Sequence, residues 1–236
     1  MYRFLLPFLS LFLSFPAVGQ DTSNGVVVAE LFTSQSCSSC PAADAVLQKI
    51  AKNDNVIALS CHVTYWDHLH WKDTLSQDFC TVRQRDYARQ LKNGSRVYTP
   101  QLVVNGQSEL VGSRKLSVIN TISNHAKKGA TPISLSESSS GNLKLDLPQF
   151  KEGKFELVLL TYKNSHTQRI TSGENRGRTV TYTNSVTDMK LLEYWNGLRH
   201  SEEYDVSHLK SLGDGFVVLA QNMRSGEIVA AGRLIF

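Results

Sequence analysis

The first half of the chain alternates between apolar runs of strand length and apolar repeats of helical spacing. Residues 26–32 (VVVAELF) form a continuous apolar run rich in β-branched residues, which is typical of a buried strand. In the next segment apolar residues recur three and four positions apart, which predicts a helix over residues 38–52. A second strand follows over 56–63. These three elements predict a strand–helix–strand unit with a parallel strand pair.

A second helix, a hairpin and a third helix are predicted further along the chain. The helices cover 76–92 and 115–128, and the strands cover 102–104 and 109–111. Asn105–Gly106 is a strong hairpin signal, so the two strands around it should be antiparallel. The resulting order, β-α-β-α-β-β-α, predicts an α/β fold of the thioredoxin-like type over residues 20–129.

After residue 129 the helical spacing gives way to short apolar or alternating runs. Strands are predicted over residues 143–147, 154–162, 178–184, 216–221 and 228–235. Turn residues separate these runs, as is typical of antiparallel sheets. We therefore predict a linker over 129–132 and a mostly antiparallel, β-rich domain over 130–236, with a flexible loop at 136–141.

The first 19 residues have the pattern of a cleavable export signal. Arg3 precedes an apolar run over 4–15, and the small residues Ala17 and Gly19 follow it. The run is too short to cross a bilayer comfortably, although an uncleaved anchor is the alternative. No later segment is apolar enough to be transmembrane. We expect cleavage after Gly19 and a periplasmic or secreted protein without stable membrane insertion.

The charge of the chain argues against a nucleic-acid partner. The formal net charge is +4, and removal of Arg3 with the signal lowers it to +3. Nucleic-acid-binding proteins usually carry a clustered basic stripe. A small excess of this kind is ordinary for a soluble surface.

The spacing of Cys37 and Cys40 carries the clearest chemical signal. The two cysteines enclose two residues, and Pro41 follows them at the start of the first predicted helix. A helix N-terminus stabilises a thiolate, which is the form that attacks disulfides. We predict that Cys37 is an exposed nucleophile and that Cys40 resolves the mixed disulfide. The alternatives are a permanent structural disulfide and half of a zinc site, although no second CxxC supplies further ligands.

Cys61 and Cys80 have three possible roles. Joined to each other, they would close a loop of about 20 residues and stabilise the fold by ~3 kcal/mol. They could also be separate buried thiols. A third possibility is a relay that passes electrons to Cys37 and Cys40, which requires contact between the two pairs.

Two further segments bear on the chemistry of the cysteines. Thioredoxin-like folds place a cis-proline just before the third core strand, facing the CxxC, and Thr99–Pro100 stands at that place. We predict a cis bond there, with Pro100 facing substrate and Thr99 contributing its backbone. Glu30, on the first strand, is a candidate acceptor for the proton of the resolving cysteine. Alternatively, Glu30 faces solvent or pairs with an arginine.

Several other groups of residues have a functional and a structural interpretation. The candidates for metal ligands are His62, Asp67, His68 and His70, although a packed loop is the alternative. Trp66 and Trp71 are candidates for a groove that holds a substrate chain. A solvated helix face is predicted for Arg83, Arg85, Arg89 and Lys92. The segment 173–184 (GENRGRTVTYTN) could bind an anion, but a structured turn is the preferred interpretation.

Together, several motifs resemble an uncharacterised family of exported bacterial thioredoxin-like proteins, known mainly as a domain of unknown function. The motifs are ELFTSQSCSSCP, HVTYWDHLHWKD, RQRDYARQL, VYTPQLVVNG and GENRGRTVTYTNSV. They cover nearly the whole mature chain. The resemblance implies the fold and an exported location, but no substrate or partner. Cys61, Cys80 and His70 depart from the family's pattern, which leaves the role of the two additional thiols open.

The leading functional hypothesis is an exported thiol–disulfide oxidoreductase that acts on protein thiols or disulfides, together with a redox partner protein. No organic cofactor is implied, because the electrons reside on sulfur. One alternative is a copper-handling protein that binds Cu(I) through the thiolates of Cys37 and Cys40. Another is a non-catalytic binding module. The sequence does not fix the direction of electron flow.

Overall fold

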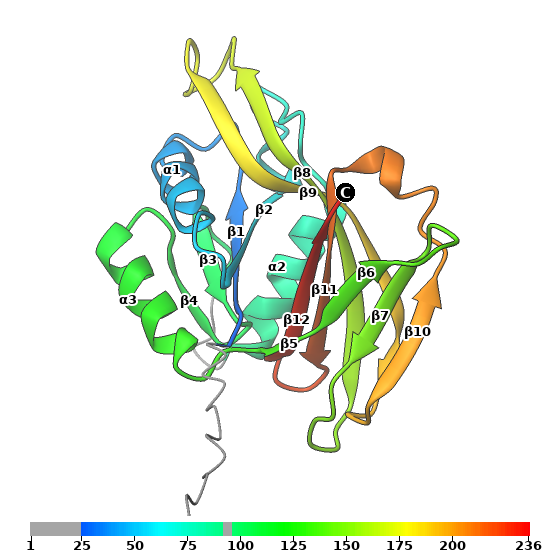
Figure 1. The fold of residues 1–236 in the computed structure, drawn as a ribbon. Coiled ribbons are helices and arrows are strands. Elements are labelled where there is room, and N and C mark those ends of the chain that lie inside the picture. The colour runs from blue at the N-terminus through cyan, green and yellow to red at the C-terminus, as the bar shows by residue number, and fades with distance from the viewer. Residues whose placement is uncertain (1–24, 92–95) are drawn as a thin grey trace, which may run out of the picture.

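The computed structural model describes residues 25–91 and 96–236. The predicted signal over 1–19 and Lys92 lie outside these residues. The fold is mixed α/β, with a nine-stranded mixed sheet, a three-stranded sheet and few helices (Figure 1). In the described ranges, every helix is too short or too polar to span a membrane.

The elements of the first half follow the predicted order. They are β1 (Val27–Thr33), α1 (Cys40–Ile50), β2 (Val56–His62), α2 (Asp78–Gln90), β3 (Gln101–Val104), β4 (Ser108–Val111) and α3 (Lys115–Ala126). A short 3-10 helix at Thr64–Trp66 follows β2. β1 pairs with β2 in parallel, whereas β1–β3 and β3–β4 are antiparallel. The predicted parallel pair and hairpin are therefore confirmed.

Alternation along β1 places its side chains against different helices. Ala29 and Leu31 pack in a core with residues of α1 and α3. Phe32 packs on the opposite face, where its ring contacts Tyr87 of α2. Successive strand residues point to opposite faces of a sheet. The polar residues of β1 are therefore divided between two faces of the sheet. We call the face covered by α1 and α3 the α1 face, and the face covered by α2 the α2 face.

The second half consists mainly of strands. They are β5 (Thr131–Pro132), β6 (Ser134–Glu137), β7 (Leu143–Leu147), β8 (Phe155–Arg169), β9 (Thr179–Trp195), β10 (His200–Tyr204), β11 (Gly215–Asn222) and β12 (Ile228–Ile235), with a 3-10 turn at Lys210–Leu212. All five predicted strands are present. β8 and β9 extend well beyond their predicted ends and form one long antiparallel hairpin. β6 covers the start of the predicted loop at 136–141.

Both halves contribute strands to the same large sheet. Its order is β4-β3-β1-β2-β9-β8-β11-β12-β5, and the halves meet where Ser60 of β2 pairs with Ser185 of β9. The Ser60 and Ser185 hydroxyls are 3.1 Å apart, and the Asn184 side chain donates to the carbonyl of Ala58 at 2.8 Å. One apolar core crosses this junction and joins residues of β1 and α2 to residues of β8 and β11.

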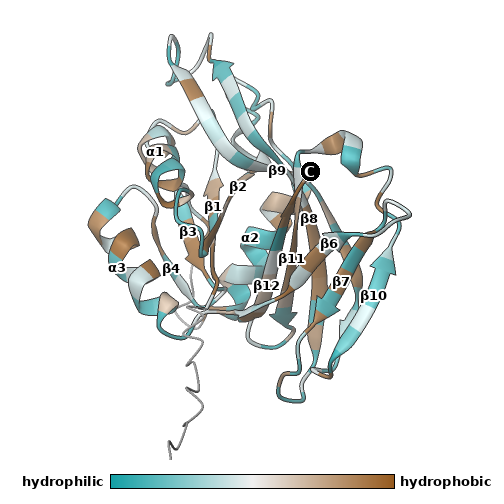
Figure 2. Ribbon diagram, viewed as in Figure 1, coloured by the Kyte–Doolittle hydropathy of each residue, from teal (hydrophilic) through white to brown (hydrophobic). Residues whose placement is uncertain are grey.

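The small sheet, ordered β10-β7-β6, covers part of the large one (Figure 1). Its inward leucines pack with Phe155, Trp195 and Phe216 in a second core. Figure 2 shows apolar residues concentrated in the strands between the layers and polar residues along the projecting end of the β8–β9 hairpin. That projecting end extends toward the beginning of α1, where the cysteine pair lies.

Candidate functional site

A disulfide joins Cys37 and Cys40 in the turn between β1 and α1, with 5.4 Å between their Cα atoms. The Cys37 N–H donates to Ser34 at 3.2 Å, and the Cys37 carbonyl accepts from the Cys40 N–H at 3.2 Å. Pro41 lies in the first turn of α1, as predicted. The helix begins at Cys40, two residues later than predicted. Cys37 therefore precedes the helix, and Cys40 is its first residue.

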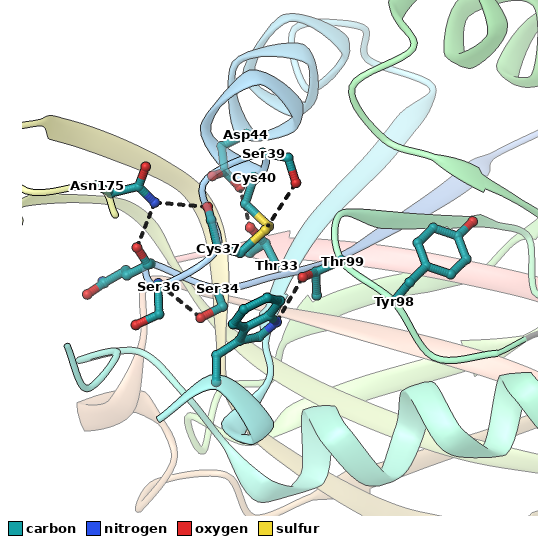
Figure 3. Close-up of a disulfide and its surroundings, with 12 residues drawn as sticks. Thr33, Ser34, Ser36, Cys37, Ser39, Cys40, Asp44, Tyr98, Thr99 and Asn175 are labelled. Atoms are coloured by element: carbon teal, nitrogen blue, oxygen red, sulfur yellow. Dashed lines mark hydrogen bonds between the residues drawn. A yellow bond between two sulfur atoms is a disulfide. The ribbon is translucent and has the colours of Figure 1, made fainter. Parts of the chain in front are cut away.

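The prediction that Cys37 is exposed is wrong for this disulfide form. Cys37 is 2% exposed and Cys40 is fully buried. Asn175, at the tip of the β8–β9 hairpin, contacts the backbone of this turn. Its side-chain amide donates to the carbonyls of Gln35 and Cys37, each at 2.9 Å (Figure 3). Ser39 is exposed, and its hydroxyl lies 3.4 Å from the Cys37 sulfur.

The hairpin tip, residues 170–178, is a structured turn. The Ile170 N–H donates to the Arg178 carbonyl at 2.9 Å, and the Gly177 N–H donates to the Ile170 carbonyl at 2.8 Å. Gly177 has a φ of 84°, a conformation that glycine adopts without steric cost. The preferred interpretation of 173–184 as a turn is confirmed. Gly173 and Gly177, two residues to either side of Asn175, mark a turn, but no sequence signal indicates which surface Asn175 contacts.

The aromatic loop after β2 also borders the disulfide. The Trp71 indole N–H donates to the Gln35 side chain at 2.8 Å, and the Ser36 hydroxyl donates to the Trp71 carbonyl. The Ser172 hydroxyl of the hairpin tip donates to the His70 carbonyl at 2.6 Å. The cysteine turn, the aromatic loop and the hairpin tip are therefore connected to one another by hydrogen bonds.

Thr99 and Pro100 lie on the segment that leads into β3. Their peptide bond is cis, as predicted. The Trp66 indole N–H donates to the Thr99 hydroxyl at 2.9 Å, which ties this segment to the aromatic loop. In the view of Figure 3, Thr99 and Asn175 flank the disulfide. A substrate groove along Trp66 and Trp71 remains a prediction.

Buried ionisable groups lie on the α1 face of the sheet, near the disulfide. Asp44 of α1 accepts a hydrogen bond from the Thr33 hydroxyl at 2.9 Å, and burial raises the pKa of Asp44 to about 7. His62 contacts Asp73 at 2.7 Å. Burial opposes ionisation of Asp73, but His62 and the backbone N–H groups of Gln35 and Leu75 lower its pKa below the usual value.

Sequence reasoning missed both aspartates. Asp44 stands four residues after Cys40, beside the apolar positions of α1, and this spacing is the signal that could have identified it. Asp73 lies in a polar loop, and its contact with His62 depends on how that loop folds back over β2.

The histidines and Asp67 do not form a metal site. His62 is buried against Asp73 and the ring of Tyr182, whereas His68 and His70 are exposed. Within residues 25–91 and 96–236, no group of three or more His, Cys, Asp or Glu side chains is placed to hold a metal ion. The packed-loop interpretation fits these contacts.

Glu30 forms the arginine pair that was one of its predicted alternatives. Arg83 of α2 donates to both carboxylate oxygens, at 2.5 and 3.0 Å, and the Tyr87 hydroxyl donates at 2.5 Å. The prediction that Arg83 is solvated is wrong, because Arg83 is 7% exposed and also donates to Gln221 at 3.1 Å. Arg85 and Arg89 are exposed, as predicted. Glu30 points to the α2 face of the sheet, whereas Cys40 begins α1 on the other face. Glu30 is therefore not placed to accept the proton of Cys40.

Cys61 and Cys80 form a second disulfide, which links β2 to α2. Their Cα atoms are 5.3 Å apart, and both residues are buried in the core. The described part of the chain contains no free cysteine. The bond between Cys61 and Cys80 is therefore confirmed, and the two residues are not separate thiols.

Comparisons with known proteins place this architecture in a family. The model of the family described as "Protein of unknown function (DUF1223)" matches residues 28–221. The crystal structure of protein AGR_C_4864 from Agrobacterium tumefaciens is 30% identical, with a TM-score of 0.78, and the match covers 89% of this chain and 95% of that one. HBP35 of Porphyromonas gingivalis is 14% identical with a TM-score of 0.58, covers 90% of this chain and 76% of that one, and shares the fold alone. The search of curated proteins gave no match. The chain belongs to the DUF1223 family of proteins of unknown function.

Proposed function

We propose that this protein is an exported thiol–disulfide oxidoreductase that acts on protein thiols or disulfides through Cys37 and Cys40. The observation that carries the proposal is the disulfide between these residues at the first residue of α1. Unpaired N–H groups and the helix dipole stabilise negative charge on sulfur at this position. The other cysteines form a separate disulfide between β2 and α2, so they do not compete for this role.

We also infer that residues 20–129 form a thioredoxin-like domain and that residues 130–236 form a β-rich domain. The element order β-α-β-α-β-β-α and the strand order β4-β3-β1-β2 support the first assignment. Helices α1 and α3 on one face and α2 on the other also support it. The second domain contributes the hairpin tip, which bonds to the backbone of the cysteine turn through Asn175.

The proposed reaction exchanges sulfur–sulfur bonds. In the reducing direction, the Cys37 thiolate attacks a substrate disulfide, a mixed disulfide forms, and the first substrate sulfur leaves as a thiolate. The Cys40 thiolate then attacks the Cys37 sulfur and releases the second substrate sulfur. The substrate gains two electrons, and Cys37 and Cys40 become the disulfide. The reverse sequence oxidises a substrate dithiol.

Access to Cys37 requires the hairpin tip to move. Asn175 bonds to the carbonyls on both sides of Ser36, so its displacement opens the cysteine turn. We propose that Thr99 contacts a bound chain through its backbone and that Pro100 faces that chain. Backbone pairing suits a protein substrate, because it does not depend on one particular side chain.

We propose an exported location, in the periplasm or outside the cell. Stable disulfides form in oxidising compartments, and the described residues contain two of them. The pattern of residues 1–19 supports the same location.

The test measures exchange between the reduced protein and a fluorogenic peptide disulfide. We expect activity in the native chain and loss of activity in Cys37→Ser. In Cys40→Ser, a mixed disulfide on Cys37 should accumulate and be visible by mass spectrometry. A chain with Cys61→Ala and Cys80→Ala is the matched control, and it should retain exchange. Absence of a mixed disulfide in Cys40→Ser would overturn the proposal.

The burial of Cys37 favours a second candidate, a binding module in which Cys37 and Cys40 are a structural disulfide. In that case the hairpin tip never leaves the cysteine turn. The Asn175→Ala variant separates the two functions, because it removes the side chain that ties the hairpin tip to the turn. Exchange activity in this variant supports the oxidoreductase, whereas inactivity of both the native chain and this variant supports the binding module.

A further inference from the structure

Asp44 is a buried acid that the exchange steps above leave unused. It is 3% exposed and lies on the α1 face of the large sheet. One carboxylate oxygen accepts from Thr33, whereas the other, Oδ2, has no hydrogen-bond partner within the described residues. An unpaired carboxylate oxygen in a protein interior is costly, and such groups often mark a catalytic role.

The helix directs Asp44 toward the resolving cysteine. Asp44 follows Cys40 by four residues, so the two side chains lie on the same face of α1. Helical side chains lean toward the N-terminus, and the Asp44 side chain therefore extends over the turn that begins with Cys40. Figure 3 shows Asp44 next to Cys40, with Thr33 behind the disulfide.

We propose that Asp44 accepts the proton of the Cys40 thiol when Cys40 resolves the mixed disulfide; this inference rests on the proposed exchange reaction. The Cys40 proton moves to Oδ2 of Asp44, and the resulting thiolate attacks the Cys37 sulfur. The bond between Cys37 and the substrate sulfur breaks, and the substrate leaves as a thiolate. Asp44 then returns the proton to that thiolate or to solvent. In the oxidising direction, neutral Asp44 protonates the Cys40 thiolate as it is released.

The proton affinity of Asp44 suits this role. Burial raises its pKa to about 7, while the charge of His62 and the hydrogen bond from Thr33 oppose that increase. A general base works best when its pKa lies near the working pH. An ordinary exposed aspartate would be a much weaker proton acceptor for a thiol.

The other charged groups around Asp44 come from several elements. His62 of β2 acts on it electrostatically, and Asp73 acts in the opposite sense. Burial raises the pKa of the Tyr182 hydroxyl on β9, and the charges of Asp44 and Asp73 raise it further. Arg178, just before β9, borders the same surface groove as Asp44. Charges of both signs therefore act on the buried Asp44 carboxylate, while its Oδ2 atom accepts no hydrogen bond from any of these groups.

The experiment separates the two chemical steps with one equivalent of 5,5′-dithiobis(2-nitrobenzoate). Attack by Cys37 releases the first thionitrobenzoate, and resolution by Cys40 releases the second. We expect Asp44→Asn to slow the second phase about tenfold or more at pH 7 and to leave the first phase unchanged. The rate of the second phase in the native chain should rise with pH around 7, whereas in Asp44→Asn it should rise only at higher pH. Asp146→Asn, at a partly exposed site on β7, is the matched control.

Thr33→Val provides an independent test that does not remove the carboxylate. Loss of the Thr33 hydrogen bond should raise the Asp44 pKa and move the midpoint of the second phase to higher pH. A second phase whose rate and pH profile are unchanged in both variants would overturn the inference. If the native chain gives no first phase, the exchange function itself fails, so the two failures are distinguishable.

Discussion

Asp44 should couple the stability of the fold to pH. Its pKa is about 7 in the folded protein, against an ordinary value of 3.8. The folded state therefore binds this proton more tightly than the unfolded state. The stabilisation from neutral Asp44 is fully present below pH 3.8 and is lost as the pH rises through about 7. A pKa difference of one corresponds to about 1.4 kcal/mol.

Asp44→Asn removes this dependence, because the amide does not titrate. We expect the native chain to lose free energy of unfolding relative to Asp44→Asn as the pH rises from 4 to 7, by a few kcal/mol. Urea unfolding of both proteins at a series of pH values measures the difference. A constant difference over this range would show that Asp44 is not held in its neutral form.

We propose that the β8–β9 hairpin controls access to the cysteines. Its tip contacts the cysteine turn through Asn175 and the aromatic loop through Ser172. Each hydrogen bond contributes about 1 kcal/mol, so a small number of bonds hold the tip closed. The tip is mainly polar, which permits its exposure to solvent at little cost (Figure 2).

Asn175→Ala should accelerate reduction of the Cys37–Cys40 disulfide by a water-soluble phosphine about tenfold or more. The reason is the loss of two hydrogen bonds, worth ~2 kcal/mol together, that hold the covered state. Mass spectrometry after alkylation measures the rate at this disulfide and at Cys61–Cys80 in the same sample. Thr181→Ala, which removes an exposed contact of the same hairpin, is the control. Equal acceleration at both disulfides would indicate general unfolding instead of opening of the tip.

Across the whole molecule, local patterns identified the elements but not the contacts between distant ones. The helix over α1 and the β3–β4 hairpin follow from apolar spacing and from Asn105–Gly106, which act over a few residues. The contact of Asn175 with Cys37 joins residues 138 positions apart in the sequence, and the place of the β8–β9 hairpin beside α1 depends on the pairing of β9 with β2. Arg83 was misassigned for the same reason, since its partner Glu30 lies 53 residues earlier.

The network around Arg83 joins the two halves of the molecule. Arg83 bonds to Glu30 of β1 and to Gln221 of β11, and Gln221 donates to the Tyr87 hydroxyl at 3.2 Å. Burial disfavours the charged form of Arg83, but the charge of Glu30 more than offsets that effect and raises its pKa. The arginine is therefore charged, and its stability in the interior depends on Glu30.

Glu30→Leu should destabilise the protein by about 3–5 kcal/mol, because it leaves the buried Arg83 charge without its carboxylate partner. Adding Arg83→Met removes the unpaired charge, so the double variant should recover most of that loss. Urea unfolding followed by both tryptophan fluorescence and far-UV circular dichroism measures the effect. Trp66 and Trp195 report on the first and second halves of the chain, respectively. Because the two halves share a core, the unfolding transitions measured by fluorescence and by circular dichroism should coincide. A loss below about 1 kcal/mol in Glu30→Leu would mean that solvent reaches Arg83 and that the network does not hold the halves together.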